Sequence, residues 1–284
     1  MARQNTFKCL RKLVKSTTER LRVDNLQTGY DAPEGFLTLT DIECVDADGT
    51  VFEKYEKLLV ANDVVRDVTG NHIDFTPYEA ITHFEEKGGF LPSMALSCNI
   101  LAKLFDKAVR KKPEGSYEML DSEAKAALDS YRNYGPGWGW HAQNTLIAYG
   151  SGRIIHYPSD SDFTNNGGNK GINSTRTRHA LEFSKDGLHD SKLEDILNGL
   201  NPELTRFLKQ FTGLRDPEKL VEIGSYFGKP ARLWFPWNDN GSNGFNEILL
   251  SWLGCNYGCN FNLYGNNSLR YCNFGASGVR EPNK

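Results

Sequence analysis

Residues 76 to 93, TPYEAITHFEEKGGFLPS, carry the signals that begin one helix, end it and begin the next. Thr76 stands at the position of an N-cap, Pro77 occupies the first helical position, and Glu79 completes a capping box. Gly88 supplies the left-handed residue at which such a helix ends. The apolar residues between these signals recur at helical spacing and predict one apolar face, formed by Tyr78, Ile81 and Phe84.

A second helix is predicted from about Ser93 to Val109, directly after the Gly-Gly-x-Leu-Pro turn. Its apolar positions again repeat every three or four residues, which predicts a buried face. The residues of that face are Leu96, Ile100, Leu101, Leu104 and Phe105. Two consecutive helices joined by a short turn are therefore the clearest local structure that the sequence predicts.

The flanking regions contain both strand and helix signals. Upstream, residues 35 to 65 alternate apolar and polar side chains around a turn at Asp46 to Gly49, which predicts a β-hairpin. Downstream, a third helix is expected at about 122 to 131, and LIAYGSGRIIHY predicts a second hairpin turned at residues 150 to 152. Residues 190 to 227 are predicted to be helical, with breaks at GLNPE and GLRDPE. The expected fold class is α+β.

The overall composition argues against several classes of protein. The 284 residues carry a net charge of -3, and 39% of them are hydrophobic, which is enough to bury a substantial core. This charge favours neither nucleic acid nor an anionic membrane as a partner. No apolar run approaches the roughly 18 residues of a membrane span, and no Sec signal peptide is recognised. Residues 1–24 are expected to form a basic helix or arm facing solvent or another subunit, with a nucleic-acid or membrane arm as the alternative.

Two groups of residues offer ligands for a metal ion. Asp160 and Asp162 could bind calcium, but the glycine and glutamate spacing of an EF-hand is missing, so a loop of Asx-turns is the alternative. Cys255, Cys259 and Cys272 suggest zinc, yet no histidine follows them to complete a ligand set. Free thiols, or one disulfide, are the expected state of these cysteines.

His141 and His156 lie near Trp138, Trp140 and Tyr157 in the sequence and could form a general base or a metal pair. No nucleophile elbow and no HExxH spacing accompanies them. We therefore expect both histidines to be satisfied residues beside buried aromatic side chains. No catalytic residue, metal or cofactor is expected.

The C-terminal segment has an unusual composition. Between Asn238 and Asn273 there are ten asparagines in 36 positions, interleaved with tyrosine, cysteine, glycine and serine. Tryptophan and leucine interrupt this run, as in SWLGCNYGCNFNLYGNNSLRYCNFGASGVR at residues 251 to 280. Ordinary asparagine-rich turns explain the polar residues but not the persistent tryptophan and leucine between them.

Two parts of the chain resemble known proteins. TPYEAITHFEEKGGFLPS is similar to the two-helix entry of the C-type lectin fold in formylglycine-generating-enzyme-like proteins, although the arginine common in that turn is absent. ARLWFPW, GSNGFN, LLSWLG and NFGASGVR resemble the variable region that ends the target proteins of diversity-generating retroelements, the family that includes the phage major tropism determinant. The two matches occur in the order expected for that family.

The resemblance implies a domain organisation. A C-type lectin fold with short antiparallel strands and two leading helices would occupy residues 25–284. It would contain an insertion at about 158–230 and a variable region at about 231–280. The matching motifs themselves cover only residues 75 to 110 and 231 to 280.

The resemblance also implies an origin for the asparagines. In that family an error-prone reverse transcriptase rewrites adenines of a template before it is copied into the 3′ end of the gene. Asparagine codons of the AAY type are preferred targets, because changing either adenine reaches tyrosine, serine, aspartate, glycine, cysteine and other residues. An ordinary series of asparagine-rich loops remains the alternative.

A division of labour within the segment follows from the resemblance. The scaffold would bury apolar area and would comprise Trp234, Trp237, Phe245, Ile248, Leu250, Trp252, Phe274 and Val279. The outward-facing variable contacts would be Asn238, Asp239, Asn240, Asn256, Tyr257, Asn260, Asn262, Tyr264, Asn266, Asn267, Tyr271 and Asn273. Tyrosine supplies rigid contact area and asparagine adaptable hydrogen bonds, the mixture that antibody paratopes use.

The function implied by the resemblance is ligand binding without catalysis. The partner would be an unidentified protein or glycan on a cell or virion surface, where this chain would itself be displayed, as a monomer or an oligomer. One alternative is a copper-dependent oxidase resembling the formylglycine-generating enzymes, for which Cys255 and Cys259 are the candidate pair. Another alternative is a structural virion or surface protein with no diversified site.

Overall fold

The structure is a computed structural model that describes residues 35–132, 139–148, 151–159, 162, 174–184, 191–234, 248–255, 260–266 and 275–282. The described residues are mixed, with 34% in helices and 34% in strands, in agreement with the α+β expectation. The expected basic helix at residues 1–24 lies outside the described residues.

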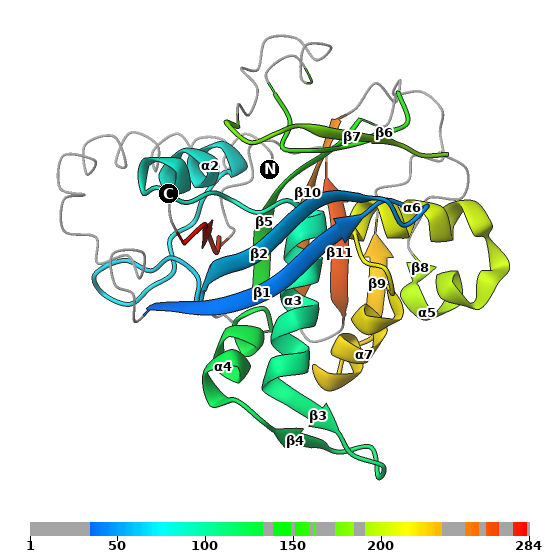
Figure 1. Cartoon of the computed structure of the whole chain (residues 1–284), viewed down its shortest axis with the longest axis horizontal. Helices are drawn as coiled ribbons and strands as arrows, with labels where there is room; N and C mark the ends of the chain where they lie inside the picture. Colours follow the sequence, from blue (N-terminus) through cyan, green and yellow to red (C-terminus); the bar gives the residue numbers. More distant parts are fainter. Residues whose placement is uncertain are drawn as a thin grey trace, which may run out of the picture.

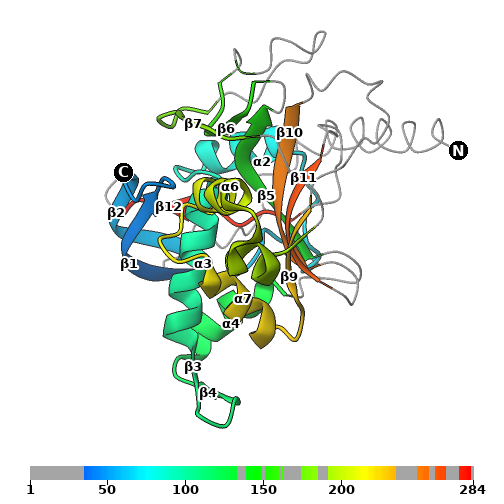
Figure 2. The same cartoon turned by 90° about the vertical axis from the view of Figure 1, so that its right-hand side faces the viewer.

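Two sheets enclose a layer of helices (Figures 1 and 2). The three-stranded sheet has the order β1-β2-β12, and the seven-stranded sheet has the order β7-β6-β5-β10-β11-β9-β8. The strands of these sheets are β1 (Phe36–Val45), β2 (Val51–Ala61), β5 (Gly139–Ala148), β6 (Arg153–His156), β7 (His179–Glu182), β8 (Ser191–Lys192), β9 (Ala231–Trp234), β10 (Ile248–Cys255), β11 (Phe261–Asn266) and β12 (Val279–Arg280). Among the named strands of these two sheets every pairing is antiparallel except that of β9 with β11.

The first predicted hairpin, β1–β2, is confirmed. Asp46 Oδ1 accepts hydrogen bonds from the backbone N–H groups of Asp48 and Thr50, at 2.9 Å each. Gly49 adopts a left-handed φ of +85° in the same turn, which a glycine tolerates at little cost. The second predicted hairpin, β5–β6, is also confirmed, with Ala148 opposite Arg153.

Helix α2 (Pro77–Glu86) begins with the predicted capping box. The N–H of Glu79 donates to Thr76 Oγ1 at 3.2 Å, and the N–H of Thr76 donates to Glu79 Oε2 at 2.9 Å. Gly88, with a φ of +72°, follows the end of the helix as predicted. The buried face differs in one residue, because Ala80 lies in the core with Ile81 and Phe84 whereas Tyr78 is 54% exposed.

Helix α3 (Met94–Ala108) lies between the two sheets (Figure 2). Ser93 caps it by accepting a hydrogen bond from the N–H of Leu96 at 3.1 Å, and Thr145 Oγ1 on β5 accepts from the N–H of Met94 at 2.8 Å. All five residues of the predicted face are buried. Both sheets cover this helix, so its burial extends well beyond one face.

Helices α4, α6 and α7 pack beside α3 in the middle layer, α5 lies next to α7 and β9, and the short β3–β4 hairpin projects from the end of α3 (Figure 1). The hairpin consists of β3 (Val109–Lys111) and β4 (Tyr117–Met119). The helices are α4 (Ser122–Ser130), α5 (Leu193–Asp195), a π-helical stretch (Ile196–Leu200), α6 (Pro202–Thr212) and α7 (Glu218–Tyr226). The predicted third helix and both predicted breaks within 190 to 227 are therefore confirmed.

The hydrophobic core has two parts. The larger cluster joins α3, α6 and α7 to both sheets, and it includes Phe207, Phe211 and Ile223 from the region expected as an insertion. The smaller cluster joins α2 to one face of β5 through Phe84, Ala142 and neighbouring residues. The helices of residues 193–226 thus share the main core.

Gly213 offers a test of how closely α6 packs on α3. It ends α6 with a φ of +62°, and a Cβ atom added there would lie 2.7 Å from Cβ of Ala95. Gly213→Ala is expected to lower the free energy of unfolding by about 2 to 4 kcal/mol, because backbone strain and overpacking add together. Gly228→Ala, at a φ of +70° with open space around it, should cost only about 1 to 2 kcal/mol. Equal losses in urea denaturation would contradict the close packing.

Candidate functional site

Strands β10 and β11 come from the asparagine-rich C-terminal segment, β9 lies just before it in the sequence, and the three strands are side by side in the large sheet (Figures 1 and 2). β9 and β11 run parallel, whereas β10 runs antiparallel to β11. The end of β9, the start of β10 and the end of β11 therefore lie at the same end of the sheet. The connections 235–247 and 267–274 attach there, and the connection 256–259 attaches at the opposite end.

This topology divides the predicted contact residues into groups. Eight of them lie outside the described residues, namely Asn238, Asp239, Asn240, Asn256, Tyr257, Asn267, Tyr271 and Asn273. Asn256 and Tyr257 belong to the connection at one end of the sheet, and the other six belong to the two connections at the other end. The strand order thus places the attachment points of these connections at both ends of β10 and β11.

The predicted contacts on β11 share one face of the sheet. Asn262, Tyr264 and Asn266 are alternating positions on this strand, so they fall on the same side. The register sets Tyr264 opposite Trp234 on β9 and opposite Trp252 on β10. Trp234 and Trp252, expected as scaffold, therefore occupy register positions paired with an expected contact, which the spacing along the sequence did not predict.

The prediction that Asn262 faces outward is wrong. Only 4% of its surface is exposed. Asn262 is paired with Gly254 of β10 and Arg232 of β9, and at this position the sheet face that carries it is closed to solvent. Asn260, directly before β11, is half-buried.

The opposite face of these strands belongs to the core. Phe261 and Leu263 on β11 and Leu253 on β10 are fully buried, and the ring of Phe261 meets that of Phe227 edge-on at 5.6 Å between centroids. Val279, an expected scaffold residue, is also buried as predicted. Phe261 and Leu263 were missed as scaffold, although their alternation with asparagine in NFNLYGN is the period of a strand with one apolar face.

Cys255 lies at the end of β10 as a buried free thiol. Burial raises its pKa to about 11, against the opposing charges of Lys229 and Arg132. A protonated thiol is a poor nucleophile and a poor ligand for a soft metal. Cys259 and Cys272 lie outside the described residues. Nowhere in the described part of the chain do three or more histidine, cysteine, aspartate or glutamate side chains gather as metal ligands would.

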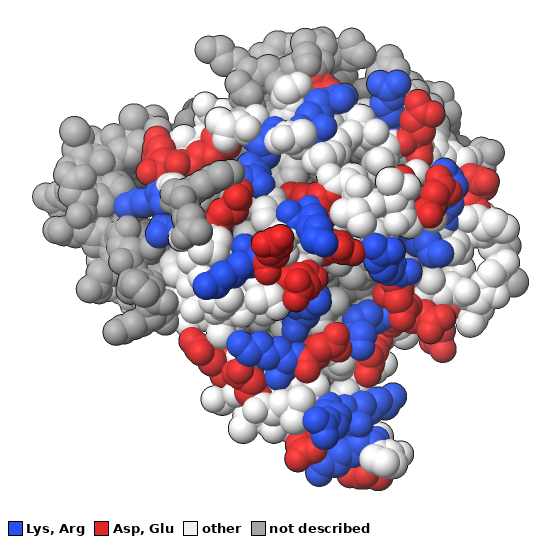
Figure 3. Space-filling view, viewed as in Figure 1, with Lys and Arg blue, Asp and Glu red and all other residues white. Residues whose placement is uncertain are grey.

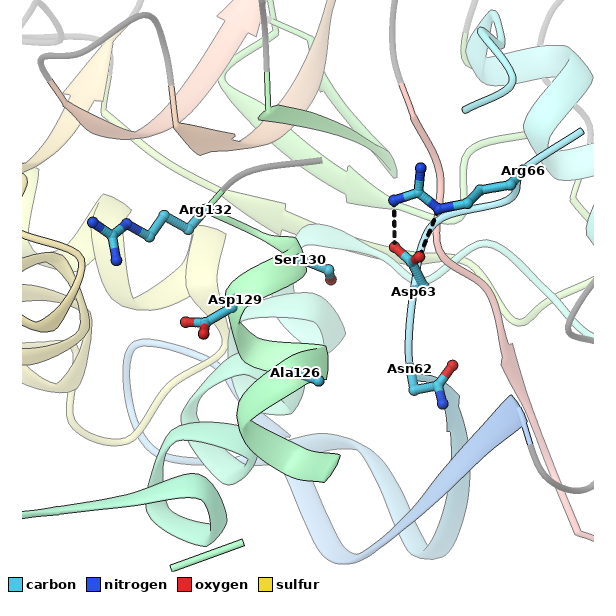
Figure 4. A pocket seen from close by; sticks show the side chains of 7 residues that line it. All are labelled: Asn62, Asp63, Arg66, Ala126, Asp129, Ser130 and Arg132. Carbon is cyan, nitrogen blue, oxygen red and sulfur yellow. Dashed lines mark hydrogen bonds and ion pairs between the residues drawn. The ribbon is translucent and has the colours of Figure 1, made fainter. Parts of the chain in front are cut away.

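An open pocket of about 460 Å³ lies between the end of α4 and the segment after β2 (Figure 4). One wall carries Asp63 and Arg66, whose Nε donates to Asp63 Oδ2 at 2.7 Å. Ser130 faces this wall from α4, whereas Asp129 and Arg132 point away from it. Asp129 is also engaged by Lys125 and by the hydroxyl of Tyr226. The polar groups of this pocket do not converge on a shared point, so its geometry supports no catalytic group.

Both histidines are buried and hydrogen-bonded beside aromatic rings, as predicted. His141 stacks on Tyr131 at 4.3 Å between ring centroids, and its Nδ1 lies 3.3 Å from the hydroxyl of Ser277. His156 stacks on Phe52, and its Nδ1 lies 2.8 Å from the hydroxyl of Thr145.

Of the two candidate calcium ligands, only Asp162 belongs to the described residues. Arg178 binds both of its carboxylate oxygens, and the N–H and hydroxyl of Ser159 donate to Oδ2 at 2.8 and 3.0 Å. The hydrogen bonds from Arg178 and Ser159 hold the pKa of Asp162 below its usual value, although partial burial opposes them. This carboxylate therefore has an ion-pair partner within the chain.

A cluster of charged and aromatic residues that the sequence did not predict lies between the three-stranded sheet and the C-terminal residues. It comprises Glu53, Tyr55, Phe90, Tyr157, Arg176 and Glu281. One signal was available, since the alternation of β2 places Glu53 on the same side as the buried Tyr55.

Within the described residues no helix is long and apolar enough to cross a membrane. No protein-family model matches this sequence, and no curated protein or solved structure is detectably similar to it.

Proposed function

We propose that this chain is a non-enzymatic ligand-binding protein of the C-type lectin fold, whose asparagine-rich C-terminal segment is diversified by a retroelement. The order of elements supports the fold proposal. A hairpin leads into two helices joined by the GGFLPS turn, a largely antiparallel sheet follows, and the last described strand, β12, lies beside the first hairpin.

The observation that carries the functional proposal is the distribution of the ten asparagines over the strands. Eight of them belong to connections between strands, and the remaining two, Asn262 and Asn266, occupy the β11 face opposite Phe261 and Leu263. The eight are Asn238, Asn240, Asn243, Asn246, Asn256, Asn260, Asn267 and Asn273. Positions 262 and 266 alternate with Phe261 and Leu263 along β11, so changes there leave the apolar residues of the core face in place.

The backbone around the segment supports a display role. Strand β9, just upstream of the segment, is hydrogen-bonded into the large sheet. At the other end of the segment, the carbonyl groups of Gly275, Ala276 and Gly278 accept hydrogen bonds from Ala142, Val65 and Ala61. Connections held at both ends resemble the loops of a binding scaffold, in which a rigid framework carries changeable residues. The ligand class proposed is a protein or glycan on a cell or virion surface.

Sequencing this gene from many members of one population tests the proposal. Substitutions are expected at AAY codons of the asparagine-rich connections, while codons for core residues such as Phe261 stay constant. A reverse-transcriptase gene and a near-duplicate template segment are expected beside the gene. Substitutions spread evenly along the chain, in the absence of a template, would reject retroelement diversification.

A further inference from the structure

Arg176 lies among three aromatic rings that come from distant parts of the chain. Its guanidinium carbon is 3.9 Å from the ring centroid of Phe90, and 5.7 and 5.9 Å from those of Tyr55 and Tyr157. The arginine belongs to the segment just before β7, whereas the rings belong to β2, the α2–α3 turn and the end of β6. Stacking at this distance is favourable for a partly buried guanidinium.

Two carboxylates complete the surroundings of Arg176. Its Nη1 donates to Glu281 Oε1 at 2.6 Å, and its Nη2 donates to the hydroxyl of Tyr55. That hydroxyl donates to Glu53 Oε1 at 2.5 Å, and the hydroxyl of Tyr157 donates to the same oxygen at 2.8 Å. Glu53 Oε2 is buried and accepts no hydrogen bond from the described residues.

Arg176 supplies the positive charge that compensates the buried carboxylate of Glu53. Burial raises the pKa of Glu53, and the two tyrosine hydroxyls and the charge of Arg176 oppose that rise. A buried carboxylate that loses its compensating charge destabilises the fold far more than an exposed one does. Among the described residues, Arg176 is the cation that acts on Glu53 in this way.

The cluster surrounds the junction between the C-terminal strand β12 and the turn that joins α2 to α3. Phe90 and Val279 exchange two backbone hydrogen bonds, at 2.9 and 3.1 Å, which join β12 to the α2–α3 turn. Arg176 contacts both sides of this junction, because it stacks on the ring of Phe90 and binds Glu281, two residues beyond Val279. A small cavity of about 220 Å³ is lined by Phe90, Arg176 and Glu281 together with Gly88, Gly89 and Thr175.

We propose that Arg176 is the positioning residue that fastens the C-terminal strand β12 to the scaffold and so fixes the downstream end of the asparagine-rich segment. The importance of this role for binding rests on the proposed function. The fastening itself is a property of the free protein, so its test needs no ligand. The exchange experiment can therefore reject the fastening while the population sequencing supports the proposed function, and the opposite pair of results is also possible.

Hydrogen exchange measured by mass spectrometry tests the fastening. In Arg176→Gln, the peptide covering residues 275–282 and the amide of Phe90 are expected to exchange about a hundredfold faster, because a partly buried ion pair is broken next to them. Arg178→Gln is the matched control, since it lies two residues away and removes an ion pair with Asp162. It should leave exchange at 275–282 within about twofold of the parent.

A second variant keeps the proposal testable if Arg176→Gln does not fold. Arg176→Lys retains the charge but loses the planar fork that stacks on Phe90 and reaches two acceptors at once. Intermediate exchange at 275–282 is expected, and millimolar ethylguanidinium added to Arg176→Ala should restore part of the lost protection. Unchanged exchange at 275–282 in Arg176→Lys and Arg176→Ala, or equal acceleration in Arg178→Gln, would overturn the proposal.

Discussion

Replacing Phe261 by alanine is expected to lower the free energy of unfolding by about 3 to 5 kcal/mol, the loss typical of a buried phenylalanine. Phe261 is fully buried on β11, an interior strand of the large sheet, with β10 on one side and β9 on the other. Its edge-on contact with Phe227 joins the sheet to the end of α7, and both residues belong to the main core. Urea denaturation followed by fluorescence and circular dichroism measures the change.

The matched controls for Phe261→Ala come from the same segment. Asn256→Ala and Asn267→Ala change residues of the two connections that adjoin β11 and should alter the free energy of unfolding by no more than about 0.5 kcal/mol. Such a contrast is what a scaffold with changeable connections requires. If an asparagine variant lost as much stability as Phe261→Ala, the proposed division between scaffold and display residues would be wrong.

The local structure of the chain could be predicted where short-range chemistry determines it. The capping box of Thr76 and Glu79, the left-handed residue at Gly88 and the turn at Asp46 all depend on residues within four positions of one another. For such features the sequence itself contains both partners of each hydrogen bond.

Features that depend on strand register could not be predicted in the same way. The order β5-β10-β11-β9 joins segments that are far apart in the sequence, and it decides that Tyr264 lies between Trp234 and Trp252. A central strand has neighbours on both sides, so a polar residue on it can be buried, as Asn262 is. The composition identified the asparagine-rich segment, but the exposure of each side chain in it depends on the packing around each strand.

The Arg176 cluster was missed for a related reason. Its charged partners, Glu53 and Glu281, lie 123 and 105 positions away in the sequence, so no local spacing connects them. Only the alternation of β2 indicated that an acidic residue would point inward. An acidic residue at an inward position predicts that some cation must approach it, without predicting which one.

Acidification from about pH 7.5 to about pH 4.5 is expected to remove about 2 to 3 kcal/mol of stability for each of His141 and His156. Burial lowers the pKa of His141 to about 4 and that of His156 to about 3, although hydrogen bonds to the carbonyls of Ser130 and Gln210 oppose the shift. In the unfolded chain both titrate near 6.5, so the unfolded state takes up protons first. Their contribution is therefore fully present above about pH 6.5 and is lost as the pH falls toward the folded-state values.

The geometry around His156 explains why protonation is unfavourable there. Its Nε2 faces the carbonyl of Gln210, which only accepts, so this nitrogen carries the hydrogen and Nδ1 accepts from the hydroxyl of Thr145. Thr145 Oγ1 in turn accepts from the N–H of Met94, at the start of α3. A second proton on His156 would disrupt this chain of hydrogen bonds, and neighbouring His179 adds further repulsion when it is charged.

His156→Gln separates this effect from the acid sensitivity of the carboxylates. The variant is expected to be less stable than the parent at every pH, but its free energy of unfolding should change less steeply between about pH 6.5 and about pH 4.5, by about 1.4 kcal/mol per pH unit. Glu53 titrates with the opposite sign, because burial raises its pKa, and it is present in both proteins, so it cancels in the comparison. Identical slopes for the parent and His156→Gln would show that His156 is not the neutral, buried base that links β6 to α6 and, through Thr145, to α3.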